Sequence, residues 1–149
     1  MKSLFTSKAF DEINERLGQL NSNHNKQWGT MDVSQMLAHC CEPLKIALEI
    51  ETSIKEPYLK KLIMGLFKHK LYDDSEWKKN LPTTDQFKIS SDKDFETELD
   101  KLRSLIKKFH QEKNKTNWVE HPVFGKFAPE QWGKIQYKHL DHHLKQFGV

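Results

Sequence analysis

The sequence predicts a single all-α domain, residues 1–149: a helical bundle of four main helices with an accessory helix and a long crossover. Three observations carry this prediction. Apolar residues recur at gaps of three and four in several separate segments, as they do on one face of a helix. No segment shows the convincing period-two alternation of a half-buried strand. The 149 residues suit one ordinary domain, and the 30% of charged residues suits helices with solvated faces.

The first predicted helix spans residues 8–20, and Ser7 is its predicted N-cap. The apolar residues of this helix share one face. They are Phe10, Ile13, Leu17 and Leu20. The following segment, NSNHNKQWG, is rich in Asn and Gly and is expected to be a loop.

The second predicted helix begins at about Asp32, because Gln35 follows three residues later in the pattern of a capping box. An apolar stripe continues from there. It contains Val33, Met36, Leu37, Cys40, Leu44 and Ala47. Pro43 interrupts the pattern, since a proline removes the N–H that would bond the carbonyl of His39. We therefore expect a kink or a break there.

The accessory helix is predicted to start at Pro57, a residue that suits the first helical position. Its expected buried face consists of Leu59, Leu62, Ile63, Leu66 and Phe67. The next stretch, LYDDSEWKKNLPTTDQFKIS, has mixed polarity and a proline. We expect it to form the long crossover.

The clearest helical pattern covers residues 91–110, where Ser91 precedes Asp94 as a capping signal. Its apolar residues follow at gaps of four and three. They are Phe95, Leu99, Leu102, Ile106 and Phe109. The last predicted helix starts at Pro129 and ends at about Phe147, with Gly148 as its C-terminal stop.

The net charge, the apolar runs and the cysteines limit the expected cellular location and the expected classes of partner. The net charge of +3 is small and the lysines are spread along the chain, which does not favour a nucleic-acid partner. No apolar run is long enough for a signal peptide or a membrane span, so no membrane partner is expected. Cys40 and Cys41 are adjacent and cannot form an ordinary disulfide with each other, which indicates a reducing compartment. We expect a cytoplasmic protein.

Two histidines of the C-terminal HLDHHLKQFGV share the apolar side of the last helix. With about 100° of rotation per residue, His143 lies about 40° from His139. Their i, i+4 spacing lets two imidazoles reach one metal ion. The lysines of this helix cluster on its other side, and His142 lies at the border. These lysines are Lys134, Lys138 and Lys145.

A metal site needs at least three protein ligands, and His39, at the edge of the apolar stripe of the second helix, is the best third candidate. The alternative is that the histidine pair is satisfied by core hydrogen bonds or is partly exposed. Cys40 and Cys41 are alternative soft ligands, although plain packing is the favoured interpretation for both. The other histidines without useful spacing are expected at the surface. They are His24, His69 and His110.

The segments WGTMDVSQMLAHC and HPVFGKF…W…HLDHHLKQFG resemble the DinB-like (DinB/YfiT) superfamily of bacterial four-helix-bundle metalloproteins, in an uncharacterised branch. The resemblance spans nearly the whole chain and implies an up-down-down-up bundle. It also implies that His39, His139 and His143 bind a divalent metal ion, zinc or nickel. Pro43, so soon after the first of these ligands, departs from the pattern.

The resemblance implies a metal-dependent enzyme, similar either to the thiol S-transferases or to the hydrolases of that superfamily. An open three-histidine site would activate a low-molecular-weight thiol or water, with a small-molecule substrate and an unassigned catalytic residue. The alternative is a non-catalytic metal- or small-molecule-binding protein of stress response. Relatives form dimers, so we also expect a homodimer.

Several residues near the predicted ligands have open roles. Glu42 and His142 are candidates to support the ligands, although an exposed role is favoured for both. His121 in HPVFG either lines a pocket or packs its loop, and loop packing is favoured. Three tryptophans either wall a cleft or belong to the core. They are Trp28, Trp118 and Trp132.

Overall fold

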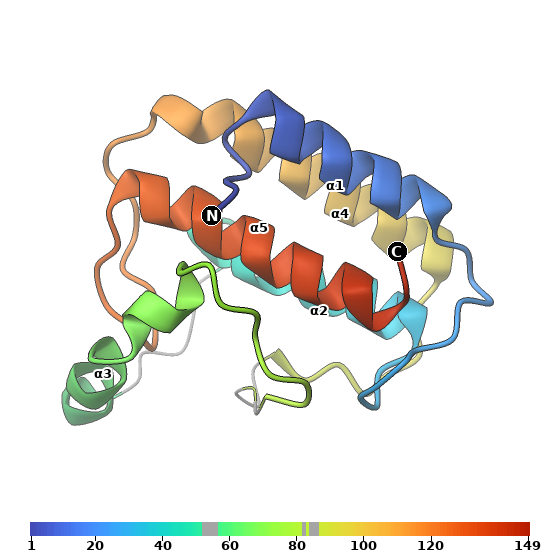
Figure 1. Ribbon diagram of the computed structural model, residues 1–149, viewed down its shortest axis with the longest axis horizontal. Coiled ribbons are helices and arrows are strands. Elements are labelled where there is room, and N and C mark those ends of the chain that lie inside the picture. The colour runs from blue at the N-terminus through green and yellow to red at the C-terminus, as the bar shows by residue number, and fades with distance from the viewer. Residues whose placement is uncertain (52–56, 82, 84–86) are drawn as a thin grey trace.

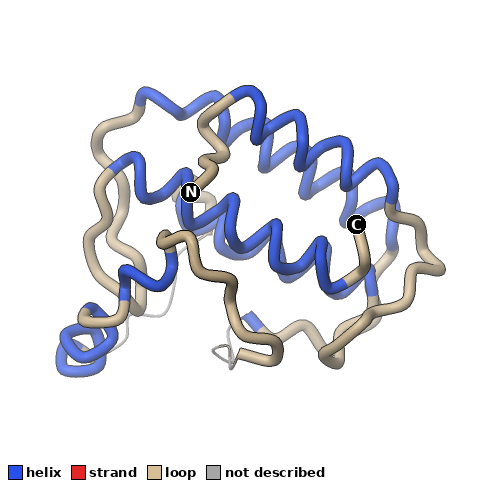
Figure 2. The backbone as a smooth tube through the Cα atoms, in the orientation of Figure 1, coloured by secondary structure: helices blue, strands red, loops and turns tan. Residues whose placement is uncertain are grey.

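The computed structural model describes residues 1–51, 57–81, 83 and 87–149, and the side chains of residues 58–61 are not described. Its elements are α1 (Ser7–Gln19), α2 (Val33–Ala47), α3 (Tyr58–Gly65), the 3-10 turn η1 (Lys68–Leu71), α4 (Phe95–Gln111), the 3-10 turn η3 (Glu112–Asn114) and α5 (Pro129–Gln146). Within these residues the regular structure is helical (Figure 2), apart from an isolated bridge between His121 and Gly125. The all-α prediction is confirmed.

The four long helices α1, α2, α4 and α5 form the body of the molecule, and α3 lies off one end (Figure 1). Contacts between the helices give their directions. The ion pair between Arg16 and Asp141, 2.7 Å long, joins the C-terminal halves of α1 and α5, which run parallel. Gln136 Nε2 donates to the carbonyl of Pro43 at 3.3 Å, and α2 runs antiparallel to α5.

The core lies between these four helices. It is built from the aliphatic stripes of each helix together with aromatic residues near both ends. Its largest fully buried side chains are Trp132, Phe109, Leu4, Ile13, Leu17, Met36, Leu37, Leu44, Leu102, Ile106, Leu140 and Leu144.

The helix starts follow capping chemistry, with two corrections to the predicted residues. Asp32 and Gln35 form the predicted capping box of α2. In α1 the N-cap is Thr6 and not Ser7, since the Thr6 hydroxyl accepts from the Ala9 amide at 3.4 Å. In α4 the N-cap is Asp94 and not Ser91. In each case the cap directly precedes the first helical residue, from where its oxygen reaches an amide of the first turn.

α2 continues through Pro43 to Ala47, so of the two expected outcomes at this proline, a kink or a break, the break is excluded. Proline removes one amide donor, but the other turns of the helix keep their bonds. The carbonyl of Pro43 is used to tie α2 to α5 through Gln136. The residue that interrupts the sequence pattern therefore contributes a contact between the two helices that carry the predicted ligands.

The expected buried face of the accessory helix is wrong. Leu62, Ile63, Leu66 and Phe67 are 57%, 51%, 73% and 57% exposed. Leu59 belongs to the same prediction and lies outside the described side chains. The apolar arc is present in the sequence, but α3 projects from the body and no described element covers it (Figure 1).

The crossover between α3 and α4 is held to α5 by Lys138. The sequence places Lys138 on the solvent side of the last helix, and the structure corrects this, since the residue is 6% exposed. Its ammonium donates to the carbonyls of Lys70 and Asp73 at 2.8 and 2.9 Å and to Asp73 Oδ1 at 2.7 Å. Three oxygen acceptors satisfy the buried charge, as burial of an ammonium requires.

The two ends of α5 match the sequence prediction. Pro129 is the first residue, and Gly148 follows the helix with a φ of +79°, a conformation that glycine adopts without strain. At the other end Leu4 donates its amide to the carbonyl of Gly133 at 2.9 Å, so the N-terminal segment runs against α5. None of the described helices has the length and apolar character needed to cross a membrane.

Candidate metal centre

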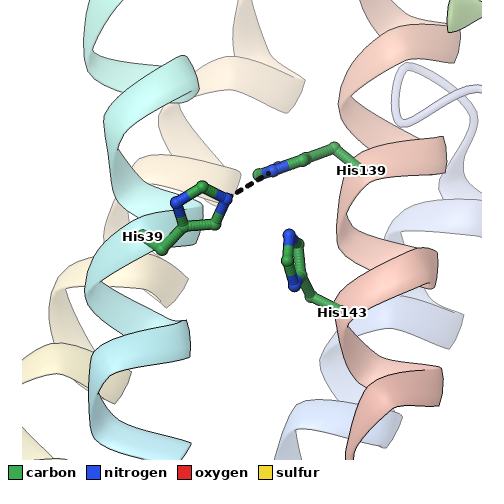
Figure 3. A group of neighbouring side chains, drawn as sticks. All are labelled: His39, His139 and His143. Carbon is green, nitrogen blue, oxygen red and sulfur yellow. Dashed lines mark hydrogen bonds between the residues drawn. The ribbon is translucent and has the colours of Figure 1, made fainter. Parts of the chain in front are cut away.

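Three histidine side chains meet between α2 and α5 (Figure 3). His39 comes from the middle of α2, while His139 and His143 lie one turn apart on α5. One ring nitrogen from each lies within 4.8 Å of the other two, and Nε2 of His39 is 3.1 Å from Nε2 of His139. The residues are only 5%, 8% and 9% exposed. The structure thus brings together the three residues that the sequence predicts.

The ring of His39 is oriented by the crossover. Its Nδ1 lies 2.8 Å from the carbonyl oxygen of Phe87. A carbonyl only accepts, so Nδ1 carries the proton and donates it. In the neutral ring Nε2 is then unprotonated, and its lone pair points toward the other two histidines.

The ring of His143 is oriented in the same way by Gln146, three residues later on α5. The amide Nε2 of Gln146 donates to the carbonyl of Trp28 at 2.7 Å, so the amide oxygen faces His143. That oxygen lies 2.8 Å from Nδ1 of His143 and accepts its proton. His143 therefore also keeps Nε2 unprotonated in the neutral ring. An outer hydrogen bond that holds the tautomer is the usual support of a metal-binding histidine.

His139 is the least constrained of the three rings. Its Nδ1 is buried and has no hydrogen-bond partner among the described residues. Its Nε2 faces Nε2 of His39, which already has its proton on the other nitrogen. Without a cation, His139 would have to donate from Nε2 and leave Nδ1 as an unsatisfied buried acceptor.

Burial keeps these imidazoles neutral. Desolvation lowers the pKa of His39, lowers that of His139 well below its ordinary value, and lowers that of His143 to about 3. Repulsion by the neighbouring histidines adds to the shifts of His139 and His143. Neutral imidazole is the form that binds a metal ion.

The donor set fits a divalent transition metal. Imidazole nitrogen is a preferred ligand of zinc, nickel and copper. Two nitrogens bound to one tetrahedral zinc at about 2.0–2.1 Å lie about 3.3 Å apart. The observed Nε2–Nε2 distance of 3.1 Å between His39 and His139 is close to that separation.

The adjacent cysteines are not part of this cluster. Among the described residues the group that could hold a metal ion contains only the three histidines. Both cysteines are buried, and Cys40 Sγ contacts Met36 Sδ at 3.7 Å inside the core. Burial raises the pKa of Cys40 well above its ordinary value and that of Cys41 to about 12. The packing interpretation of the sequence stands.

Glu42 and His142, the candidates to support the three histidines, are both half-buried, so the favoured exposed position is wrong for each. Glu42 pairs with Lys45 at 2.8 Å. His142 is half-buried between two tryptophans, with ring centroids 5.8 Å from Trp28 and 5.7 Å from Trp77. Its centroid also lies 5.2 Å from that of His143, so His142 belongs to the surroundings of the centre.

His121 shapes its own loop. Its Nδ1 accepts from the amides of Val123 and Phe124 at 3.2 and 3.3 Å, and its ring stacks on Trp132. The favoured interpretation, loop packing, agrees with these contacts.

The three tryptophans divide between the core and the surroundings of the histidine cluster. Trp132 is buried against Trp118 in the aromatic core, whereas Trp28 lies beside His142.

The remaining histidines are outside the centre. His69 is exposed, as expected, and His24 is partly exposed, with its Nδ1 accepting from the Asn21 amide. His110 departs from the expected surface position. It is half-buried, stacks on Phe10, and its Nδ1 donates to the carbonyl of Leu4 at 2.8 Å.

Sequence reasoning missed the residues that orient the three histidines. The position of Gln146 carries a usable signal, because it follows His143 at i+3 and so shares its side of α5. Trp77, whose ring centroid is 6.0 Å from that of His139, and the carbonyl of Phe87 come from the crossover. An aperiodic segment gives no pattern from which such contacts can be read.

A pocket of about 210 Å³ opens beside the centre. Its walls include Trp28, Trp77 and His142, together with charged residues of α5 and the crossover. The three clustered histidines do not line it. The pocket and the centre meet at Trp77 and His142, which contact the cluster from the outside.

Comparison with known proteins adds one match. A family model described as a protein of unknown function (DUF1569) matches residues 2–148. No curated protein and no solved structure matches the chain. Because the family model covers nearly its whole length, the chain belongs to the DUF1569 family.

Proposed function

We propose that this protein is a metal-dependent enzyme in which His39, His139 and His143 hold one divalent ion. The observation that carries the proposal is the pair of outer hydrogen bonds. Phe87 and Gln146 fix the tautomers of two buried rings so that their unprotonated nitrogens face the cluster. Ordinary core histidines need partners for both nitrogens, whereas these rings are arranged as donors around a common point.

Zinc or nickel is the proposed ion, since three neutral imidazoles suit either metal. A bound ion with an open coordination position would lower the pKa of a coordinated water or thiol and so provide a nucleophile at neutral pH. The proposed reaction is therefore a thiol S-transfer or a hydrolysis. The pocket beside His142 supports a small-molecule substrate, with a low-molecular-weight thiol as a candidate co-substrate. No catalytic residue beyond the ligands is assigned.

We also propose a relationship to the DinB-like superfamily. Two features support it. Helices α1 and α5 run in one direction while α2 and α4 run in the other (Figure 1), which is an up-down-down-up order. The three histidines occupy the second and last helices of the four-helix body, as in that superfamily. Because relatives in that superfamily form dimers, we also propose that this protein is a homodimer.

Elemental analysis of protein purified without a histidine tag tests the site. We expect close to one equivalent of zinc or nickel in the native protein and loss of most of it in His139→Ala. The matched control is His69→Ala, because His69 is exposed on η1 and should leave the metal content unchanged. Metal-free native protein, or equal metal content in the two variants, contradicts the proposal.

A non-catalytic binding protein is the second candidate, favoured by the separation of the pocket from the three histidines. Turnover of metal-loaded protein against a panel of thiols with electrophiles, and of esters, distinguishes the two. Metal-dependent turnover that disappears in His139→Ala supports the enzyme. Stoichiometric metal without turnover of any member of the panel supports the binding protein.

A further inference from the structure

The accessory helix presents large apolar side chains to solvent. Leu62, Ile63, Leu66 and Phe67, the apolar face of α3, are each more than half exposed. Leu66 and Phe67 follow the last residue of the helix with right-handed helical backbone, so the four residues lie at helical spacing. They form one stripe, with Leu62 next to Leu66 and Ile63 next to Phe67.

The orientation of this stripe is the reverse of that in an ordinary surface helix. Met64 and Gly65 of the same helix are half-buried, while the larger apolar residues face outward. Exposure of such side chains is unfavourable, and a contiguous apolar patch on a protein surface marks a place of contact. The position of α3 away from the four-helix body leaves the patch accessible to a large, flat partner (Figure 1).

The segment that carries the patch is also strongly basic. Residues 57–71, PYLKKLIMGLFKHKL, contain four lysines and no Asp or Glu. The side chain of Lys70 is 62% exposed, and its pairing with Asp73 is a long 3.3 Å contact. His69 beside it is exposed. A partner for this surface must therefore be apolar and anionic at once.

We propose that α3 docks the protein on an anionic membrane surface. The apolar face of α3 enters the boundary between headgroups and acyl chains, and Lys68 and Lys70, directly after it, attract the anionic headgroups. A second copy of the chain fits less well, because it would bring two lysine-rich segments together. This proposal is independent of the metal centre. It revises the expectation of no membrane partner, which rested on the lack of a spanning segment.

Co-sedimentation of the full-length protein with lipid vesicles tests the proposal. We expect binding to vesicles of phosphatidylglycerol and phosphatidylcholine, and little binding to phosphatidylcholine alone. The double variant Leu66→Ser, Phe67→Ser should lower the partition coefficient about tenfold or more. Lys68→Glu with Lys70→Glu should lower it by a similar factor, and added salt should weaken the binding of the native protein.

Matched control variants distinguish docking through α3 from non-specific adsorption to vesicles. Leu81→Ser removes another exposed apolar side chain, at 49% exposure, and Lys107→Glu with Lys108→Glu reverses exposed charges on α4. Both should bind as the native protein does, and circular dichroism checks that every variant is folded. Equal binding to both vesicle types, or equal loss in the controls, overturns the proposal. Self-association that is lost in Leu66→Ser, Phe67→Ser without vesicle binding, or capture by an acidic protein instead, also overturns it.

Discussion

Replacing Gln146 by leucine should weaken metal binding although the residue touches no metal ion. Gln146 is 3% exposed, and its oxygen accepts from His143 Nδ1 at 2.8 Å while its nitrogen donates to Trp28 at 2.7 Å. Leucine removes both bonds and frees His143 to adopt the other tautomer. Loss of such an outer partner costs about 10–100-fold in affinity, or about 1.4–2.7 kcal/mol.

The same change should destabilise the fold. His143 Nδ1 and the carbonyl of Trp28 would lose their partner, and each such group costs about 1–3 kcal/mol when it stays buried. Part of this cost disappears if water reaches the Trp28 loop. We therefore expect the free energy of unfolding of the metal-free protein to fall by roughly 2–4 kcal/mol in Gln146→Leu.

Two further variants separate the effect on the metal from the effect on the fold. Gln136→Leu removes another buried glutamine of α5, 1% exposed and bonded to Pro43, and should lower stability with no change in affinity. Gln146→Glu keeps an oxygen acceptor for His143 but turns a second acceptor toward the Trp28 carbonyl and buries a charge, so it should retain near-native affinity and lose stability.

The assay is a competition titration of untagged, metal-free protein against a chromogenic zinc chelator, with urea denaturation run in parallel. Native-like affinity in Gln146→Leu would refute the argument that Gln146 sets the tautomer of His143. An equal loss of affinity in Gln136→Leu would assign the effect to general destabilisation.

Three other outcomes follow from buried groups. Lys138→Met should lower the free energy of unfolding by about 2 kcal/mol, because it removes the bonds that join the crossover to α5; unchanged urea denaturation would contradict this. Metal-free protein should lose stability as the pH falls from about 6.5 toward 3. In this range His143 is protonated in the unfolded chain, where its pKa is about 6.5, but stays neutral in the folded protein, where burial lowers its pKa to about 3. That histidine alone accounts for about 1.4 kcal/mol at pH 5.5, and equal urea midpoints at pH 7.5 and 5.5 would count against it. Cys40 and Cys41, buried and with raised pKa values, should not react with Ellman's reagent in the native protein at pH 8 but should react in urea. Rapid native-state reaction would show that the core around them opens.

The helices of the body and the cluster of three histidines could be predicted from the sequence because both depend on helical periodicity. The i, i+4 spacing of His139 and His143 places them on one side of α5 whatever lies opposite. His39 is predictable because it sits at the edge of an apolar stripe that must face the core. Capping chemistry likewise placed the start of α2 at Asp32.

The contacts that sequence reasoning missed are made with segments or backbone groups whose sequence has no recognisable periodicity. Periodicity finds the apolar arc of α3 but not whether another element covers it, and none of the described ones does. Lys138 is buried because two carbonyls and a carboxylate of an aperiodic segment surround it. The acceptor for His39 is a backbone carbonyl, which any residue at position 87 would provide. Such contacts follow from the path of the chain and not from residue types.

X-ray absorption spectroscopy of the untagged protein loaded with one equivalent of zinc tests the metal centre most directly. The arrangement of His39, His139 and His143 predicts three imidazole nitrogens at about 2.0–2.1 Å, with a further light ligand in the open position. A sulfur ligand at about 2.3 Å, or fewer than three imidazoles around the ion, would show that the metal binds elsewhere and would contradict the proposed site.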